Sequence, residues 1–181
     1  MRILGIDPGS HAMGYGLIDC AAGRVRHVDH GTLRPARGVP LAERLGRLHA
    51  GLAELVGRAA PDVVAVEQVF VSASPRSALV LGQARGIALA AAGGAGLAVH
   101  EYTARTIKLA VTGTGAAGKA EVQRMVQALL ALERRPAQDA ADALAVALCH
   151  GRARRLPAGA ARGRGRRGGS RAGRFVMRVS R

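Results

Sequence analysis

The sequence of 181 residues has few aromatic residues, few cysteines and few acids. Aromatic residues make up only 2% of the chain, so a hydrophobic core has to be built from Val, Leu, Ile and Ala. The two cysteines, Cys20 and Cys149, lie far apart and have neither CxxC nor Cys/His spacing, which argues against a zinc site. We therefore expect two reduced structural thiols, as in a cytosolic protein.

A long apolar run is also missing. Asp7 interrupts the N-terminal apolar segment almost at once, which argues against a signal peptide. The longest uncharged stretch, residues 86–99, is too short and too rich in Gly to span a bilayer. We expect a cytoplasmic protein that does not enter a membrane.

Positive charge is abundant but unevenly distributed. The chain has 27 Lys and Arg against 12 Asp and Glu, a net charge of +15. Residues 152–181 contain eleven Arg and no acid, so only +4 of that net charge lies in residues 1–151. The basic segment is rich in Arg, Gly and Ala and lacks the apolar content for a core. We predict one folded domain over residues 1–151 and a disordered basic tail over residues 152–181.

Periodicity and turn signals predict ten elements in the first 151 residues. Short connections favour an antiparallel meander of the first three strands, and the later elements alternate between helix and strand. This order is typical of a mixed α/β sheet with helices on both faces. The expected strands are 2–6, 15–20, 25–33, 63–66 and 97–102, and the expected helices are 40–58, 77–92, 103–110, 119–132 and 139–150.

Two acids follow apolar strands in a chain that has little acid. Asp7 ends the apolar run 3–6, and Glu67 ends the apolar run 63–66. If these two strands lie side by side in parallel, both carboxylates reach the same edge of the sheet, where ligand sites of open α/β sheets form. We expect Asp7 and Glu67 to lie within a few ångströms of each other.

Two further acids, Asp139 and Asp142, are three residues apart and so share one face of a predicted helix. Their neighbours Ala140, Ala141 and Ala143 are small, which would let this helix approach the sheet closely. We expect the helix to bring both carboxylates over the first two.

Each acid alone has a structural explanation. An Asp before Pro-Gly is typical of a turn, and an Asp at a helix start is favoured by the helix dipole. Four clustered carboxylates, however, repel one another, and two Mg²⁺ ions would offset that repulsion and hydrolyse a phosphodiester. Together with the net positive charge of the chain, the four acids indicate a metal-dependent nuclease.

Four sequence blocks, in this order and spacing, closely resemble the RuvC family, the bacterial Holliday-junction resolvases of the RNase H-like superfamily. The resemblance spans residues 1–151 and not the tail. The blocks are Ile-Leu-Gly-Ile-Asp-Pro-Gly-Ser at 3–10 with Gly-Tyr-Gly at 14–16, Val-Glu-Gln-Val-Phe at 66–70, Leu-Gly-Gln-Ala-Arg-Gly at 81–86 and Gln-Asp-Ala-Ala-Asp-Ala-Leu-Ala at 138–145.

The resemblance implies an RNase H-like five-stranded sheet and a homodimer that nicks opposing strands of a four-way DNA junction. It implies two Mg²⁺ per active site, with Mn²⁺ as a substitute, and 5′-phosphate products in recombination and repair. It also implies cooperation with the branch-migration proteins RuvA and RuvB. The Gly- and Ala-rich helix at 77–92 matches the dimer surface.

By the same resemblance, the family's four catalytic, metal-binding acids match Asp7, Glu67, Asp139 and Asp142. Some relatives have His at the position of Asp139, so this chain carries the all-carboxylate version.

The resemblance also assigns residues to DNA. Lys108 and Lys119 match basic positions that contact DNA near the site, although a solvated helix-end lysine is the plainer interpretation. Phe70, close after Glu67, matches an aromatic ring that stacks on bases at the junction centre, although a core position is the alternative. Arg76 could bind phosphate from the following loop, or be an ordinary surface charge.

Two other functions fit parts of the sequence. Asp7, Gly9 and Gly14 also fit the phosphate loop of actin-like ATPases and sugar kinases, but those proteins need a second domain for which the chain is too short. A non-catalytic basic DNA-binding protein would explain the tail but not the acids.

Overall fold

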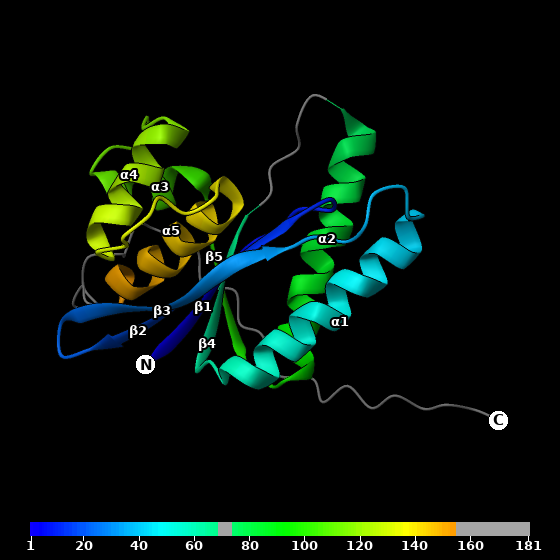
Figure 1. Ribbon diagram of the computed structural model, residues 1–181, viewed down its shortest axis with the longest axis horizontal. Helices are drawn as coiled ribbons and strands as arrows, with labels where there is room; N and C mark the ends of the chain where they lie inside the picture. Colours follow the sequence, from blue (N-terminus) through cyan, green and yellow to red (C-terminus); the bar gives the residue numbers. More distant parts are fainter. Residues whose placement is uncertain (69–73, 155–181) are drawn as a thin grey trace, which may run out of the picture.

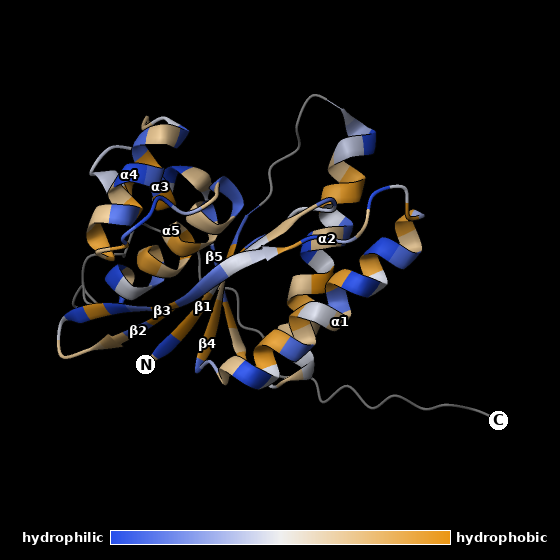
Figure 2. Ribbon diagram, viewed as in Figure 1, coloured by the Kyte–Doolittle hydropathy of each residue, from blue (hydrophilic) through white to orange (hydrophobic). Residues whose placement is uncertain are grey.

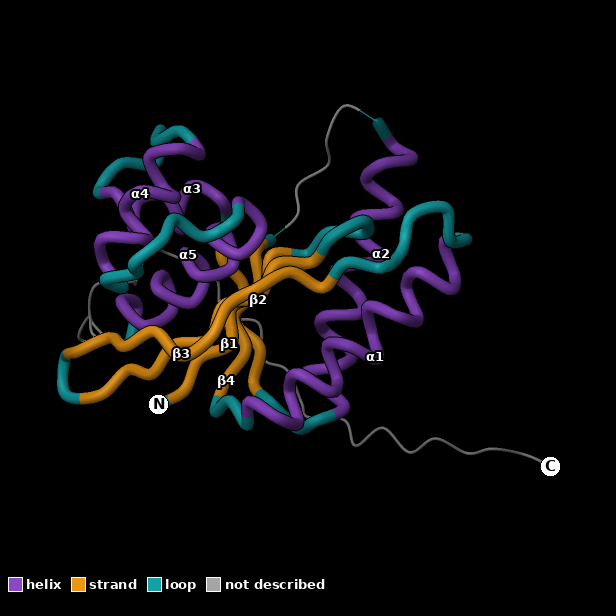
Figure 3. The backbone as a smooth tube through the Cα atoms, in the orientation of Figure 1, coloured by secondary structure: helices purple, strands orange, loops and turns teal. Residues whose placement is uncertain are grey.

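The computed structural model describes residues 1–68 and 74–154, and its centre is one five-stranded sheet (Figures 1 and 3). The strand order is β3-β2-β1-β4-β5. β2 is antiparallel to both neighbours, whereas β4 is parallel to β1 and to β5. The predicted meander and mixed sheet are therefore confirmed. The strands are β1 (Arg2–Asp7), β2 (Met13–Ala21), β3 (Arg24–Leu33), β4 (Val63–Glu67) and β5 (Ala98–Tyr102).

Five helices cover the two faces of this sheet (Figure 1). α1 (Leu41–Ala59) and α2 (Pro75–Gly94) pack on one face, and α3 (Ala104–Thr112), α4 (Lys119–Leu129) and α5 (Gln138–Ala153) pack on the other. Side chains alternate along β1, so Leu4 and Ile6 join the core under α1 and α2 while Ile3 joins the core under α5. Figure 2 shows apolar residues alternating with hydrophilic ones along α1, whereas α5 is largely apolar and packs on α3 and α4 as well as on the sheet.

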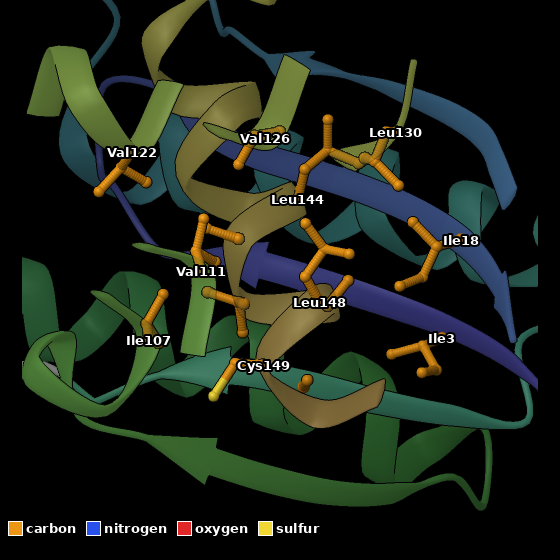
Figure 4. Close-up of a cluster of buried hydrophobic side chains, with 14 of the residues drawn as sticks. Ile3, Ile18, Ile107, Val111, Val122, Val126, Leu130, Leu144, Leu148 and Cys149 are labelled. Carbon is orange, nitrogen blue, oxygen red and sulfur yellow. The ribbon is translucent and has the colours of Figure 1, made fainter. Parts of the chain in front are cut away.

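The core on the α5 side is made almost entirely of aliphatic side chains. Figure 4 shows Ile3 and Ile18 from the sheet facing Leu144 and Leu148 of α5, with Val126 of α4 above them. All five side chains are buried. Aliphatic side chains therefore make up the core on both faces of the sheet, and the rings of Tyr15 and Tyr102 pack only at its margins.

α5 lies directly against β1 and β2 because the facing residues are very small. A Cβ atom added at Gly5 would overlap the Ala143 carbonyl oxygen, and one added at Gly16 would lie 2.7 Å from Leu144. Ala140 and Ala141 of α5 are each 1% exposed. The predicted close approach of this helix is confirmed.

Most helix ends lie within two residues of the predictions, and the ends of α4 and α5 differ by three. α4 stops at Leu129 rather than 132, because Ala131 takes a left-handed conformation with φ 49° that ends the helix. α5 runs to Ala153, past the expected domain boundary at 151. The side chain of Arg152 donates a hydrogen bond to the Ala110 carbonyl oxygen, so the first residues of the basic segment pack on the domain.

None of the helices in the described ranges is long and apolar enough to cross a membrane.

Acid should destabilise the fold through one buried histidine. His150 is 1% exposed, its Nδ1 is 2.8 Å from the Tyr102 hydroxyl, and its Nε2 has no hydrogen-bond partner among the described residues. Burial, and then the nearby His100, lower the pKa of His150 to about 4. Because the unfolded chain takes up this proton near pH 6.5 and the folded chain does not, stability falls as pH drops from about 6.5 to 4.

We expect His150 to contribute a loss of about 2 kcal/mol in unfolding free energy between pH 6.5 and pH 5. Urea titrations at several pH values give the unfolding free energy of wild type and of His150→Gln. The difference between the two proteins in how steeply this free energy falls with pH measures the contribution of His150. The exposed His49→Gln is the matched control for replacing a histidine by glutamine. Parallel curves for wild type and His150→Gln would contradict the prediction.

Candidate active site

The ends of β1 and β4 place two acids at one edge of the sheet. Ile6 of β1 pairs with Val66 of β4, so the next residues, Asp7 and Glu67, leave neighbouring parallel strands together. They line an open hollow of about 270 Å³ with Asp142 of α5. Three of the four predicted acids therefore meet where the sequence places them.

Two lysines line the same hollow. Lys108 comes from the middle of α3, and Lys119 is the first residue of α4. The remaining walls are apolar, formed by Ala104, Ile107, Val122 and Ala145. The hollow thus combines three carboxylates with two ammonium groups, the charges needed to hold cations and to attract a phosphate.

The carboxylates share an unfavourable electrostatic environment. Burial first, and then the charges of Glu67, Asp142 and Asp139, raise the pKa of Asp7 to about 8 against the opposing charge of Lys119. Burial is also the largest cause that raises the pKa of Glu67 and of Asp142. Desolvation and mutual repulsion therefore disfavour three ionised carboxylates here, and a divalent cation would relieve both.

The fourth acid, Asp139, points elsewhere. Arg34 Nη2 donates a hydrogen bond to Asp139 Oδ2 at 3.0 Å, and Asp139 does not line the hollow. Its charge still raises the pKa of Asp7 and of Asp142, so it lies close by. The structure brings Asp139 beside the other acids without aiming it at them.

The donor set fits a hard cation. All the candidate ligands are carboxylate oxygens, which suit Mg²⁺ or Mn²⁺ rather than the His and Cys ligands of zinc. Within residues 1–68 and 74–154 no three Asp, Glu, His or Cys side chains converge as a ready-made metal site. Rotation of the side chains, above all release of Asp139 from Arg34, is needed before all four could ligate.

The other predicted DNA contacts lie apart from this hollow. Arg76, the second residue of α2, lines a separate hollow with Ser10, His11 and Arg44. Phe70 falls outside the described residues, so its expected role stays a prediction.

Sequence reasoning missed Arg34, the partner of Asp139. A signal for it exists: β3 runs parallel to β1, so the residue after Leu33 lies at the same sheet edge as Asp7. With 27 basic residues in the chain, no single arginine stands out without that topology.

The fold and this site agree with a known family. The family model described as "Crossover junction endodeoxyribonuclease RuvC" matches residues 3–150. The chain belongs to the RuvC family. The predicted resemblance is thereby confirmed over nearly the whole of the described part.

Several RuvC proteins show the same relation. The RuvC protein of Marinobacter nauticus is 55% identical over 148 residues, which cover 82% of this chain and 84% of that protein. The RuvC protein of Halorhodospira halophila is 55% identical over 161 residues, covering 88% of this chain and 95% of that protein.

Solved structures confirm the RNase H-like fold. T. thermophilus RuvC in complex with a Holliday junction substrate superposes with a TM-score of 0.77 at 38% identity, covering 83% of this chain and 92% of that one. The yeast mitochondrial Holliday junction resolvase Ydc2 superposes with a TM-score of 0.59 at 15% identity, which shows the shared fold alone.

Proposed function

We propose that this chain is an endonuclease that resolves Holliday junctions, in homologous recombination and DNA repair. It makes paired nicks in opposing strands and leaves 5′-phosphates. The observation that carries the proposal is the hollow where Asp7, Glu67 and Asp142 meet Lys108 and Lys119, in a chain of the RuvC family. The same hollow supports cation-dependent hydrolysis, because burial and neighbouring carboxylates raise the pKa of each of its three acids and a bound cation would favour their ionised forms.

The acids of the hollow bind cations, and its lysines bind phosphates. Asp7, Glu67 and Asp142, joined by Asp139 once it leaves Arg34, hold two Mg²⁺, for which Mn²⁺ can substitute. Bound cations supply activation of the attacking water and stabilisation of the leaving oxygen. Lys119 and Lys108 draw the scissile and neighbouring phosphates toward the acids.

The test is cleavage of a synthetic four-way junction against a linear duplex of the same sequence. We expect nicks at matching positions in two opposing strands, dependent on Mg²⁺ and sealed by DNA ligase. Equal cleavage of the duplex, or no cleavage of the junction, would refute the proposal. ATP hydrolysis measured on the same sample tests the alternative interpretation of Asp7, Gly9 and Gly14 as an ATPase loop.

The structure gives the two alternatives little support. Asp7 faces Glu67 and Asp142 rather than a second domain, and the RuvC family match extends over residues 3–150. A protein that only binds DNA would have no use for three acids in one hollow, because carboxylates repel phosphates.

The exposed face of α2 supports an assembly of two copies of this chain. This helix is rich in Gly and Ala, has no acid in its first turn, and exposes 71% of Leu79. Exposed apolar surface of this kind marks an interaction site. We infer a homodimer formed through α2, which acts with RuvA and RuvB in the cytoplasm.

Phe70 follows Glu67 by three residues in the sequence. We infer that its ring stacks on bases at the junction centre, as the RuvC resemblance implies.

The basic tail should add affinity that depends on salt. We propose that residues 1–151 and the end of α5 form the nuclease domain and that the rest of the tail binds DNA without selectivity. Residues 155–181 contain nine of the eleven Arg of the tail. Deleting them leaves Arg152 and its bond to Ala110 in place. The deletion should flatten the slope of log affinity against log salt by about 0.9 for each phosphate that the tail neutralises in the wild-type complex.

Junction-selective nicking should survive that deletion. A full-length variant with the same nine arginines changed to Gln is the matched control, because it removes the charge and keeps the length. An unchanged salt slope in both variants would show that the tail does not touch DNA.

A further inference from the structure

A second basic region is connected to the acidic cluster by the ion pair between Arg34 and Asp139. One hollow of about 580 Å³ is lined by Arg34, Arg37, Arg44 and His11, and another of about 540 Å³ is lined by Arg76 and again by His11 and Arg44. We call these five residues, which the shared lining joins, the arginine cleft. No acidic residue lines either hollow.

Arg44 connects the two halves of this cleft and lacks a full set of partners. Its Nε is buried and has no hydrogen-bond partner among the described residues, and its Nη1 lies 3.2 Å from His11 Nδ1. A buried guanidinium N–H without an acceptor is costly, and an anion in the cleft would supply the acceptor. In the described part of the chain, Arg37, Arg44 and Arg76 form no ion pair with a carboxylate, so their charge is available to a ligand.

The cleft reaches the active site through Arg34. This residue follows β3, lines the cleft and binds Asp139. Arg44 belongs to α1 and Arg76 to α2, on one face of the sheet, whereas Lys108 and Lys119 belong to α3 and α4 on the other (Figures 1 and 3). The acids therefore stand at the sheet edge between two groups of positive charge.

We propose that the arginine cleft binds backbone phosphates of the DNA substrate on the side of the active site opposite Lys108 and Lys119, with Arg44 as its anchor. The inference rests on the proposed junction-cleaving function and extends it. A strand that crosses the sheet edge contacts lysines on one side and arginines on the other. Its scissile phosphate is thereby held over the acids. Arginine suits this task because its planar fork grips phosphate oxygens in pairs.

The test measures binding separately from cleavage. A fluorescent four-way junction is titrated with protein in EDTA over a series of salt concentrations, for wild type, Arg44→Gln and Arg37→Gln. The matched control is Arg58→Gln, which removes the same charge from the other end of α1, where the side chain is 66% exposed and lies near Asp29. Thermal melting of each variant checks the fold.

We expect Arg44→Gln to weaken junction binding about tenfold at low salt and to lower the salt slope by about one. Arg58→Gln should change affinity less than about twofold. Arg37 is exposed, so we expect Arg37→Gln to fold even if Arg44→Gln is unstable. Arg37→Gln should also weaken junction binding. Arg44→Lys should restore part of the affinity that Arg44→Gln removes.

Other outcomes count against the inference. If wild type binds the junction and neither Arg44→Gln nor Arg37→Gln differs from Arg58→Gln, the cleft does not hold DNA. If inorganic phosphate stabilises wild type but not Arg44→Gln while DNA binding is unchanged, the cleft binds a small anion instead. Failure of wild type itself to bind or cut the junction would instead refute the proposed function.

Discussion

Replacing Asp7 with Asn is expected to lower the rate of junction cleavage by at least about a thousandfold, equivalent to roughly 4 kcal/mol of barrier. Burial is the largest cause that raises the pKa of the Asp7 carboxyl, and the charges of Glu67, Asp142 and Asp139 all raise it further. The amide keeps the shape of the side chain but cannot supply the negative charge that a cation requires. Junction binding should stay within about threefold of wild type, because basic side chains supply the phosphate contacts.

The same substitution should make the cation-free protein more stable. The pKa of Asp7 is about 8 in the fold against 3.8 for the free side chain, so ionisation opposes folding. The contribution of Asp7 to the free energy of unfolding is therefore most favourable at low pH and is lost as pH rises from about 4 to about 8. Asn cannot ionise, so the variant does not lose stability over this range. At pH 7.5 Asp7→Asn should therefore melt several degrees above wild type.

These two readouts separate a chemical role from a structural one. Single-turnover cleavage and thermal melting are measured on wild type, Asp7→Asn and the exposed control Glu54→Gln, which should match wild type in both. A variant that cleaves at nearly the wild-type rate would overturn the metal-ligand role. A variant that melts lower and no longer binds the junction would show that Asp7 supports the fold.

The parts of the site carried by strands could be predicted from the sequence. Fully apolar runs such as residues 63–66 fit a strand that is covered on both faces, and parallel neighbours bring their carboxyl ends to one edge. Strand polarity and apolar character are enough to put Asp7 beside Glu67. The helix with Asp142 follows from the small residues around it.

The long-range partners could not be predicted in the same way. Arg34 lies 105 residues from Asp139 in the sequence, and their ion pair depends on where the end of β3 meets the start of α5. Neither the periodicity nor the composition of a local segment contains that information. The arginine cleft is hidden from the sequence for the same reason, since Arg44 and Arg76 belong to two helices, α1 and α2, that only the tertiary fold brings into contact.

The close packing of α5 leads to the second large effect, at Gly14 of β2. A Cβ atom there would overlap the backbone carbonyl of Asp139, the second residue of α5. A backbone atom has no rotamer by which to move aside, so Gly14→Ala should push the start of α5 away from the sheet. Asp139 and Asp142 would move with it, while Asp7 and Glu67 would stay on their strands.

We expect Gly14→Ala to lower cleavage by roughly a hundredfold, the loss that a shift of about 1 Å can cause, and to lower stability by about 1–3 kcal/mol. Gly46→Ala in α1 is the matched control, because nothing lies within 4 Å of the added Cβ atom. Removing a helical glycine there should add up to about 1 kcal/mol of stability and leave cleavage unchanged. Cleavage of a four-way junction by the folded fraction of each variant, determined beside urea unfolding, distinguishes displacement of the acids from simple loss of protein. If Gly14→Ala loses stability but its folded molecules still cut at the wild-type rate, the position of α5 does not set the geometry of the acids.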